Sequence, residues 1–128
     1  KEYNYVPLFA FYSRFNEYSN YTWVNIGDFE HAINALSNED IIVGIKTIHD
    51  GGEDHYKIIQ LTNQDLIDEE IRILRFALEE KAFTLSDIIQ EFQWKKEKVL
   101  NILGILTENG LLRYSKSYLH GEKWYLVL

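Results

Sequence analysis

The order in which hydrophobic periods follow one another constrains the fold most, and it is clearest in the second half of the chain. Apolar residues at helical spacing predict a helix over 64–81. The Thr84-x-x-Asp87 pattern is typical of a helix start and predicts a short second helix. A third helix is predicted over 95–109, before a Gly that favours helix termination. Two apolar runs within 111–127 then predict a hairpin around a nine-residue polar loop.

The first 61 residues carry a shorter version of the same order. Pro7 precedes a run of apolar and aromatic residues at helical spacing, and Asp28 is expected to cap a second helix. β-Branched runs at 41–45 and 56–61 flank a Gly-Gly turn and predict a hairpin. The joining segment, 61–67, has no Pro, Gly or Ser run, so we expect the two halves to pack against each other.

Helices followed by a two-stranded hairpin are the order of a winged helix. The sequence therefore predicts an α+β, mainly helical chain of tandem winged helix-turn-helix units, each a helix bundle with a β-hairpin wing. We expect residues 1–63 to form a first, acidic unit and residues 64–128 a second unit with a basic third helix and hairpin. The alternative is a single winged helix with an α/β arm.

Charge divides the chain in the same way. The 128 residues include 13 Lys and Arg and 20 Asp and Glu, for a net charge of −7. Residues 1–70 carry 4 basic and 13 acidic side chains, whereas residues 94–128 carry 6 basic and 3 acidic ones. Acidic side chains repel phosphate, so the first unit is predicted to bind protein rather than nucleic acid.

Residues suited to catalysis do not converge. Cysteine is absent, which excludes disulfides and thiolate metal sites, and no Gly-rich phosphate loop or nucleophile motif occurs. The segment His49–His55 contains ligand types suited to zinc, but its Gly-Gly centre is typical of a solvated hairpin turn. We therefore predict no enzyme activity, no cofactor and no metal site. No apolar run is long enough to span a membrane, and the Met-free chain beginning at Lys1 is expected to be part of a longer protein.

The strongest candidate for nucleic-acid or partner contact is the third helix of the second unit with its hairpin. In a winged helix that helix is the one that enters the DNA major groove. Lysines interleaved with aromatic residues could contact phosphates and stack on bases. The alternative is that the lysines are only the solvated face of an amphipathic helix. The candidate residues are Trp94, Lys95, Lys96, Lys98, Arg113, Lys116, Tyr118, His120 and Lys123.

Aromatic residues are concentrated at the start of the chain. The sequence has 9 Tyr, 7 Phe and 3 Trp, and nine of these lie within the first 23 residues. A small unit cannot bury so many large rings, so we expect some of them to face a protein partner, for which Tyr and Trp are favoured anchors. The candidate interface aromatics are Phe9, Tyr12, Tyr18, Tyr21 and Trp23.

Two stretches resemble known families. Phe29-x-x-Ala32-Ile33-x-x-Leu36, Ile41-Ile42, an acidic Gly-containing turn, Tyr56-Lys57-Ile58-Ile59 and Asp65-Leu66 are similar to the C-terminal tandem winged helices of the middle subunit of the telomeric CST complex, including its ciliate telomerase-holoenzyme counterpart. That resemblance implies a non-catalytic platform in the nucleus, at chromosome ends, that docks telomerase or DNA polymerase α–primase, with weak or no direct nucleic-acid contact.

The second resemblance is shorter. Tyr5-Val6-Pro7-Leu8-Phe9 resembles the opening of the ESCRT-II subunits, which are also tandem winged helices. This resemblance implies a role in sorting membrane proteins. A third hypothesis, from the fold order alone, is a winged-helix transcription or replication factor that binds DNA as a dimer.

Overall fold

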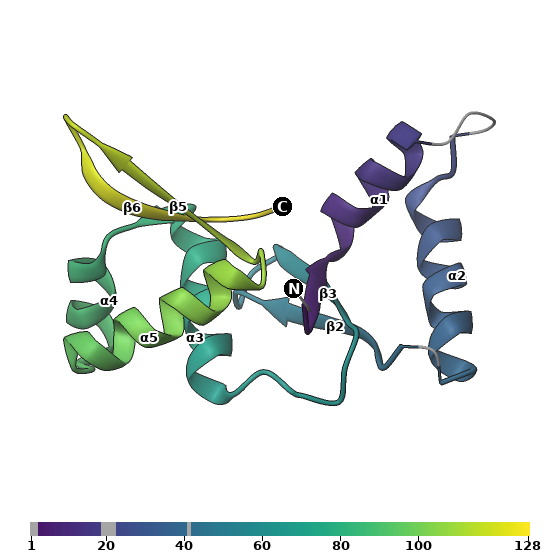
Figure 1. The fold of residues 1–128 in the computed structure, drawn as a ribbon, viewed down its shortest axis with the longest axis horizontal. Coiled ribbons are helices and arrows are strands. Elements are labelled where there is room, and N and C mark those ends of the chain that lie inside the picture. The colour runs from purple at the N-terminus through teal and green to yellow at the C-terminus, as the bar shows by residue number, and fades with distance from the viewer. Residues whose placement is uncertain (1–2, 19–22, 41) are drawn as a thin grey trace.

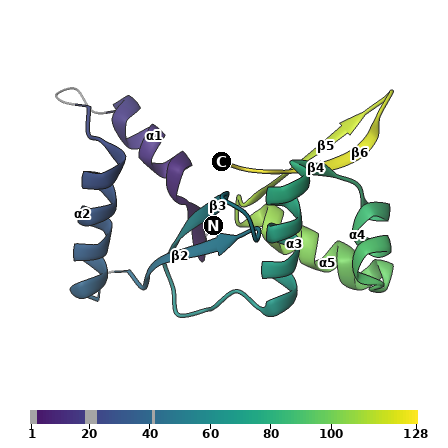
Figure 2. The same cartoon turned by 180° about the vertical axis from the view of Figure 1, so that it is seen from behind.

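A computed structural model describes residues 3–18, 23–40 and 42–128 (Figure 1). Among these residues, five helices and two three-stranded antiparallel sheets form two units that lie side by side, as both views show (Figures 1 and 2). The elements are β1 (Tyr5–Pro7), α1 (Leu8–Tyr18), α2 (Ile26–Asn38), β2 (Gly44–His49), β3 (His55–Gln60), α3 (Asp68–Glu80), β4 (Ala82–Phe83), α4 (Leu85–Phe92), α5 (Lys96–Glu108), β5 (Leu112–Ser117) and β6 (Gly121–Leu126).

The second unit has the order helix, strand, two helices and hairpin. Its sheet runs β4-β6-β5, with Phe83 and Tyr114 on either side of Trp124. The capping box that opens α4 is present: Asp87 N–H donates to Thr84 Oγ1 at 3.2 Å, and Thr84 N–H donates to the Asp87 carboxylate at 2.9 Å. The predicted capping pattern is therefore confirmed by its geometry.

The first unit repeats this order from the strand onward. Its sheet runs β1-β3-β2, so that the strand before the helices pairs with the last strand of the hairpin, as in the second unit. The helices α2 and α5 have 13 residues each, and both end with the same pair of backbone hydrogen bonds. Glu39 N–H donates to the Ala35 carbonyl and Asp40 N–H to that of Ser37. In the same way, Asn109 N–H donates to the Ile105 carbonyl and Gly110 N–H to that of Thr107.

The second residue after each of these helices is left-handed. Gly110 has φ +76°, and Asp40, at the equivalent place in the first unit, has φ +61°. A side chain makes this conformation costly, whereas glycine adopts it freely. We expect Asp40→Gly to raise the free energy of unfolding by about 0.5–1 kcal/mol, measured by urea denaturation. The matched control is Gly110→Asp, where a Cβ meets no atom within 4 Å; a gain from this change would contradict the prediction.

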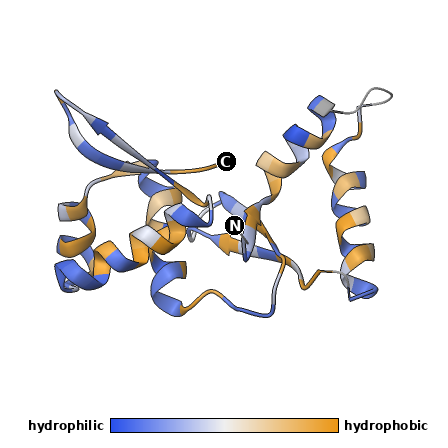
Figure 3. Cartoon of the chain, in the orientation of Figure 1, coloured by the Kyte–Doolittle hydropathy of each residue, from blue (hydrophilic) through white to orange (hydrophobic). Residues whose placement is uncertain are grey.

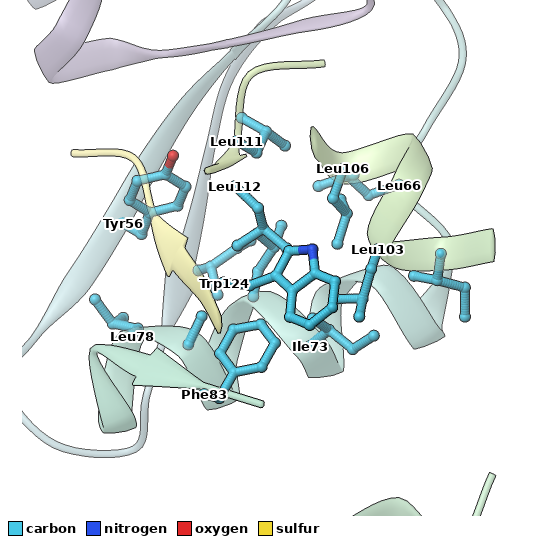
Figure 4. Packing of buried hydrophobic residues seen from close by; sticks show 14 of the residues in the cluster. Tyr56, Leu66, Ile73, Leu78, Phe83, Leu103, Leu106, Leu111, Leu112 and Trp124 are labelled. Carbon is cyan, nitrogen blue, oxygen red and sulfur yellow. The ribbon is translucent and has the colours of Figure 1, made fainter. Parts of the chain in front are cut away.

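The two units share one hydrophobic core. One face of the first sheet contributes Ile48, Tyr56 and Ile58 to the cluster that also holds α3, α5 and the second sheet. Figure 4 shows Tyr56 beside Leu111 and Leu112 of the second unit. The other face of the first sheet packs on α1 and α2 through a smaller cluster of Leu8, Tyr12, Phe29, Ile33 and Ile59. The expectation that the halves pack together is confirmed.

Hydrogen bonds join the units at the edges of this core. Tyr56 Oη donates to the carbonyl of Val127, and Asn4 N–H donates to Asn109 Oδ1 at 3.0 Å. Arg75 Nε donates to the carbonyl of His49 at 2.8 Å. These bonds hold both ends of the first sheet to the second unit, so the two units have little freedom to separate.

Two buried tyrosines make the fold sensitive to alkaline pH. Burial, with help from Glu70 and Asp65, raises the pKa of Tyr5 to about 12, and burial raises the pKa of Tyr56 further above its usual value. The phenols stay neutral in the folded chain at a pH where those of the unfolded chain ionise, so stability is full below about pH 10 and falls above it. In urea unfolding between about pH 8 and about pH 11.5, we expect Tyr5→Phe and Tyr56→Phe each to reduce this loss. Tyr118→Phe, at an exposed site, should leave it unchanged.

Several predicted boundaries are wrong by a few residues. Helix α2 begins at Ile26 and is capped by Asn25, whose Oδ1 accepts from Asp28 N–H at 2.9 Å, so Asp28 lies within the first turn. Helix α3 begins only at Asp68. Strand β5 ends at Ser117 and strand β6 begins at Gly121, so the loop between them is shorter than the predicted nine residues. The first hairpin strands are 44–49 and 55–60; Ile41 lies outside the described residues.

Candidate protein-interaction surface

Two phenylalanines of α1 lie partly in solvent beside the core of the first unit. Phe11 and Phe15 are 44% and 46% exposed, and both rings lie within 6 Å of the Phe29 ring, at 5.8 and 5.5 Å. Rings packed at this distance bury one side and leave the other free. Both belong to the aromatic-rich start of the chain, where the sequence predicted that some rings face a partner.

Helix α2 continues this apolar surface. Ala32 and Leu36 are exposed, one and two turns along the helix face that also carries the buried Phe29. Figure 3 shows apolar residues recurring along α2 and over the first part of α1. We call the set Phe11, Phe15, Ala32 and Leu36 the open apolar face. Asp28, in the first turn of this helix, and Glu39, directly after its last residue, give it an acidic border.

A buried amide joins α1 to the residue Val24, just before α2. Val24 N–H donates to Asn16 Oδ1 at 2.8 Å, and Asn16 Nδ2 donates to the carbonyl of Val24 at 3.1 Å. This pairing holds the residues before α2 against α1. It also places Trp23, whose ring meets Tyr12 edge-on at 6.4 Å between centroids.

The predicted interface aromatics fall into three groups. Phe9 and Trp23 are exposed, Trp23 by 68%. Tyr12 is buried instead, because it lies on the centre of the inward face of α1 and packs against Phe29 at 5.4 Å. Tyr21 and the side chain of Tyr18 lie outside the described residues. The open apolar face was missed, because its signal was only the excess of aromatic residues.

The predicted basic site begins at the start of α5. Trp94 stacks on Phe92 at 4.6 Å, and the Lys98 ammonium lies 4.9 Å from the Trp94 ring. The same ammonium lies 3.5 Å from a carboxylate oxygen of Glu69 on α3. Lys98 is thus held by groups within the chain, while Lys95 and Lys96 are exposed.

The wing residues lie apart from that helix start. Figure 1 shows the tip of the β5–β6 hairpin and the first turn of α5 at opposite ends of the second unit. Tyr118 is fully exposed at the tip, and Tyr114 Oη donates to Glu122 at 2.6 Å. Lys123 is half-buried, whereas the other predicted residues, Arg113, Lys116 and His120, are exposed. The structure therefore does not bring the predicted basic residues into one patch.

The acidic, histidine-containing hairpin forms a turn. His49 and His55 are cross-strand partners with ring centroids 5.4 Å apart, and Gly52 N–H donates to Asp50 Oδ1 at 2.7 Å. Within the part of the chain that the structure describes, no group of three or more His, Asp or Glu side chains is placed to hold a metal ion. No described helix is long and apolar enough to cross a membrane.

Comparison with known proteins shows the fold. No protein-family model and no curated protein matches the sequence. Among solved structures, the chain is similar to one from "The crystal structure of endosomal complex ESCRT-II (VPS22/VPS25/VPS36)", with a TM-score of 0.63 and 15% sequence identity. The match covers 96% of this chain and 54% of that one, so the chain spans about half of its length. The predicted α+β class with tandem winged-helix units is confirmed.

Proposed function

We propose that the chain is a non-catalytic module that holds protein partners within a multisubunit assembly. The observation that carries this proposal is the open apolar face of the first unit, which lies beside an acidic border. Apolar side chains grouped on a surface favour protein contact, and carboxylates there disfavour phosphate. The structural similarity to a chain of ESCRT-II, a complex named for several subunits, supports the same role.

Quantitative affinity purification tests this function. The tagged chain is expressed in its own cells as wild type, as Phe15→Ser/Leu36→Ser and as Lys95→Glu/Lys96→Glu, and each eluate is treated with nuclease. We expect a stoichiometric protein to be retained by the wild type and the charge variant and lost from the apolar variant. Retention of the same proteins by all three, or loss of all of them on nuclease treatment, would contradict the proposal.

The assembly itself can be proposed from two directions. The similarity across both units favours a sorting complex of the ESCRT-II type. A telomeric assembly that docks telomerase or DNA polymerase α–primase is supported by the residue pattern of the first unit alone. The two differ in what the retained protein should be, so its identification in the same purification decides between them.

DNA or RNA binding is the function of a different class. Its support is the exposure of Lys95 and Lys96 at the start of the helix that enters the major groove in winged helices. Fluorescence anisotropy with labelled duplex and single-stranded oligonucleotides at about 50 mM salt measures it. We expect weak binding that Lys95→Glu/Lys96→Glu barely changes; tight, steeply salt-dependent binding lost in that variant would support a nucleic-acid reader instead.

A further inference from the structure

The open apolar face has a covered counterpart in the second unit. The helices α1 and α4 both begin just after the strand that pairs with the last hairpin strand, and α2 and α5 have equal lengths and matching last turns. When residues are counted from the first residue of each of these helices, every residue of the open apolar face has an equivalent in the second unit. The pairs are Phe11 with Ile88, Phe15 with Phe92, Ala32 with Ile102, and Leu36 with Leu106.

Burial differs between the two members of these pairs, sharply in three of them, whereas Phe92 is half-buried. Ile88 is 0% exposed and Leu106 is 1% exposed, whereas Phe11 is 44% and Leu36 is 37% exposed. The equivalent positions therefore belong to a closed core in one unit and to a surface in the other. Exposure of this kind leaves apolar area that a partner could remove from water.

The element that closes the second unit is α3. Its Ile73 and Leu74 belong to the same buried cluster as Ile88 and Leu106, and its Phe76 ring lies 6.0 Å from that of Phe92. Among the described residues of the first unit, no helix precedes β1 in the way that α3 precedes β4. Within the described residues, the first unit thus exposes the surface that corresponds to the one α3 covers in the second.

We propose that the open apolar face binds an amphipathic helix of a partner protein, which occupies in the first unit the place that α3 occupies in the second. The inference rests on the proposed function and adds to it the surface and the chemistry of the partner. Such a helix carries apolar side chains at positions i, i+3 or i+4, and i+7, the spacing with which helices dock into grooves.

Charge at one equivalent position indicates the sign of the partner helix. In the second unit, Glu69 of α3 lies 3.5 Å from Lys98 of α5. The residue of α2 equivalent to Lys98 is Asp28, because Glu39 and Asn109 end the two helices. The partner helix is therefore expected to carry Lys or Arg where α3 carries Glu69, since opposite charges across an interface fix partner choice.

A second copy of this chain fits the surface less well. Within the described residues, α3 is the only helix of the chain that precedes the first strand of a winged-helix unit. It is already packed against α5, β4 and β6 of its own unit and against β2 of the first unit. Releasing it would expose Ile73, Leu74 and Ala77, all fully buried. A separate partner avoids this loss of burial.

Two synthetic peptides serve as probes of the face. Both span residues 67–81, capped at each end and labelled with fluorescein; one has the natural sequence and the other carries Glu69→Lys, Glu79→Lys and Glu80→Lys. Asp68 and Glu70 stay in both, because acidic residues in the first turn stabilise a helix. Fluorescence anisotropy measures the binding of each peptide to the 128-residue chain.

We expect the basic peptide to bind one-to-one and at least tenfold more tightly than the natural one. Phe15→Ser/Leu36→Ser should weaken it at least tenfold, whereas Leu119→Ser, at the exposed wing tip, should not change it. Asp28→Lys should reverse the preference between the peptides. Circular dichroism of each variant should match that of the wild type, because all four substituted side chains lie on the surface.

Other outcomes overturn the proposal. Equal affinity for the wild type and Phe15→Ser/Leu36→Ser, or no binding of either peptide, would show that the face does not receive such a helix. A dimer in sedimentation equilibrium that Phe15→Ser/Leu36→Ser converts to a monomer would assign the face to a second copy. If the peptides fail while affinity purification still loses a protein from the apolar variant, the proposed function stands and the helix proposal falls.

Discussion

Replacing Ile58 with alanine should lower the free energy of unfolding by about 2–5 kcal/mol, the range for removing a large aliphatic side chain from a closed core. Ile58 is fully buried, and it belongs to the first sheet while most of its cluster belongs to the second unit. Because one core serves both units, the loss is expected in a single transition. Urea denaturation followed by far-ultraviolet circular dichroism measures it.

The control for this change is Val43→Ala, just before β2, where the side chain is exposed. Its effect should stay within about 0.5 kcal/mol, as for most surface substitutions. Two separate transitions, of which Ile58→Ala shifts only one, would mean that the units unfold independently and that the shared core does not couple them.

The second large effect is expected at Asn16. Asn16→Ala removes both hydrogen bonds to Val24 and leaves a backbone donor and acceptor without their partner, which costs about 1–3 kcal/mol. The change should also release Trp23 from its contact with Tyr12. Thermal unfolding gives the stability, and the assigned indole N–H signal of Trp23 in a proton–nitrogen NMR spectrum of the native chain reports its environment.

Asn34→Ala provides the comparison, because Asn34 is exposed on α2. It should change stability by less than about 0.5 kcal/mol. If Asn16→Ala were as mild as Asn34→Ala, the paired hydrogen bonds would not hold Val24 against α1, and the position of Trp23 would need another explanation.

The order of elements was predictable because periodicity and end signals are local. The helix of residues 96–108 was expected from its apolar spacing and from the Gly at 110, which takes the left-handed conformation. The strands β1 and β4 were not expected, since runs of two or three residues carry no periodic signal. Helix α3 was predicted too long because Ile67 keeps the helical spacing, yet it is 51% exposed before the first turn.

The candidate site was less predictable because exposure depends on which elements are neighbours. Phe11 and Ile88 look alike in sequence, each on the apolar stripe of a short helix, but Ile88 packs in a cluster that includes α3, which has no counterpart in the first unit among the described residues. The lysines were predicted from their positions in the third helix and its hairpin, but the separation of the wing from the start of α5 is a property of the folded unit. Lys98 further depends on Glu69, which lies 29 positions earlier in the sequence and on another helix.

Solvent paramagnetic relaxation enhancement is the most direct test of the open face. A soluble gadolinium chelate broadens the signals of protons that solvent reaches, so it compares the two units within one sample. The account predicts strong broadening of the ring protons of Phe11 and Phe15 and of the methyls of Leu36, with the methyls of Ile88 and Leu106 protected. Equal protection of both sets would contradict the claim that the first unit leaves uncovered the surface that α3 covers in the second.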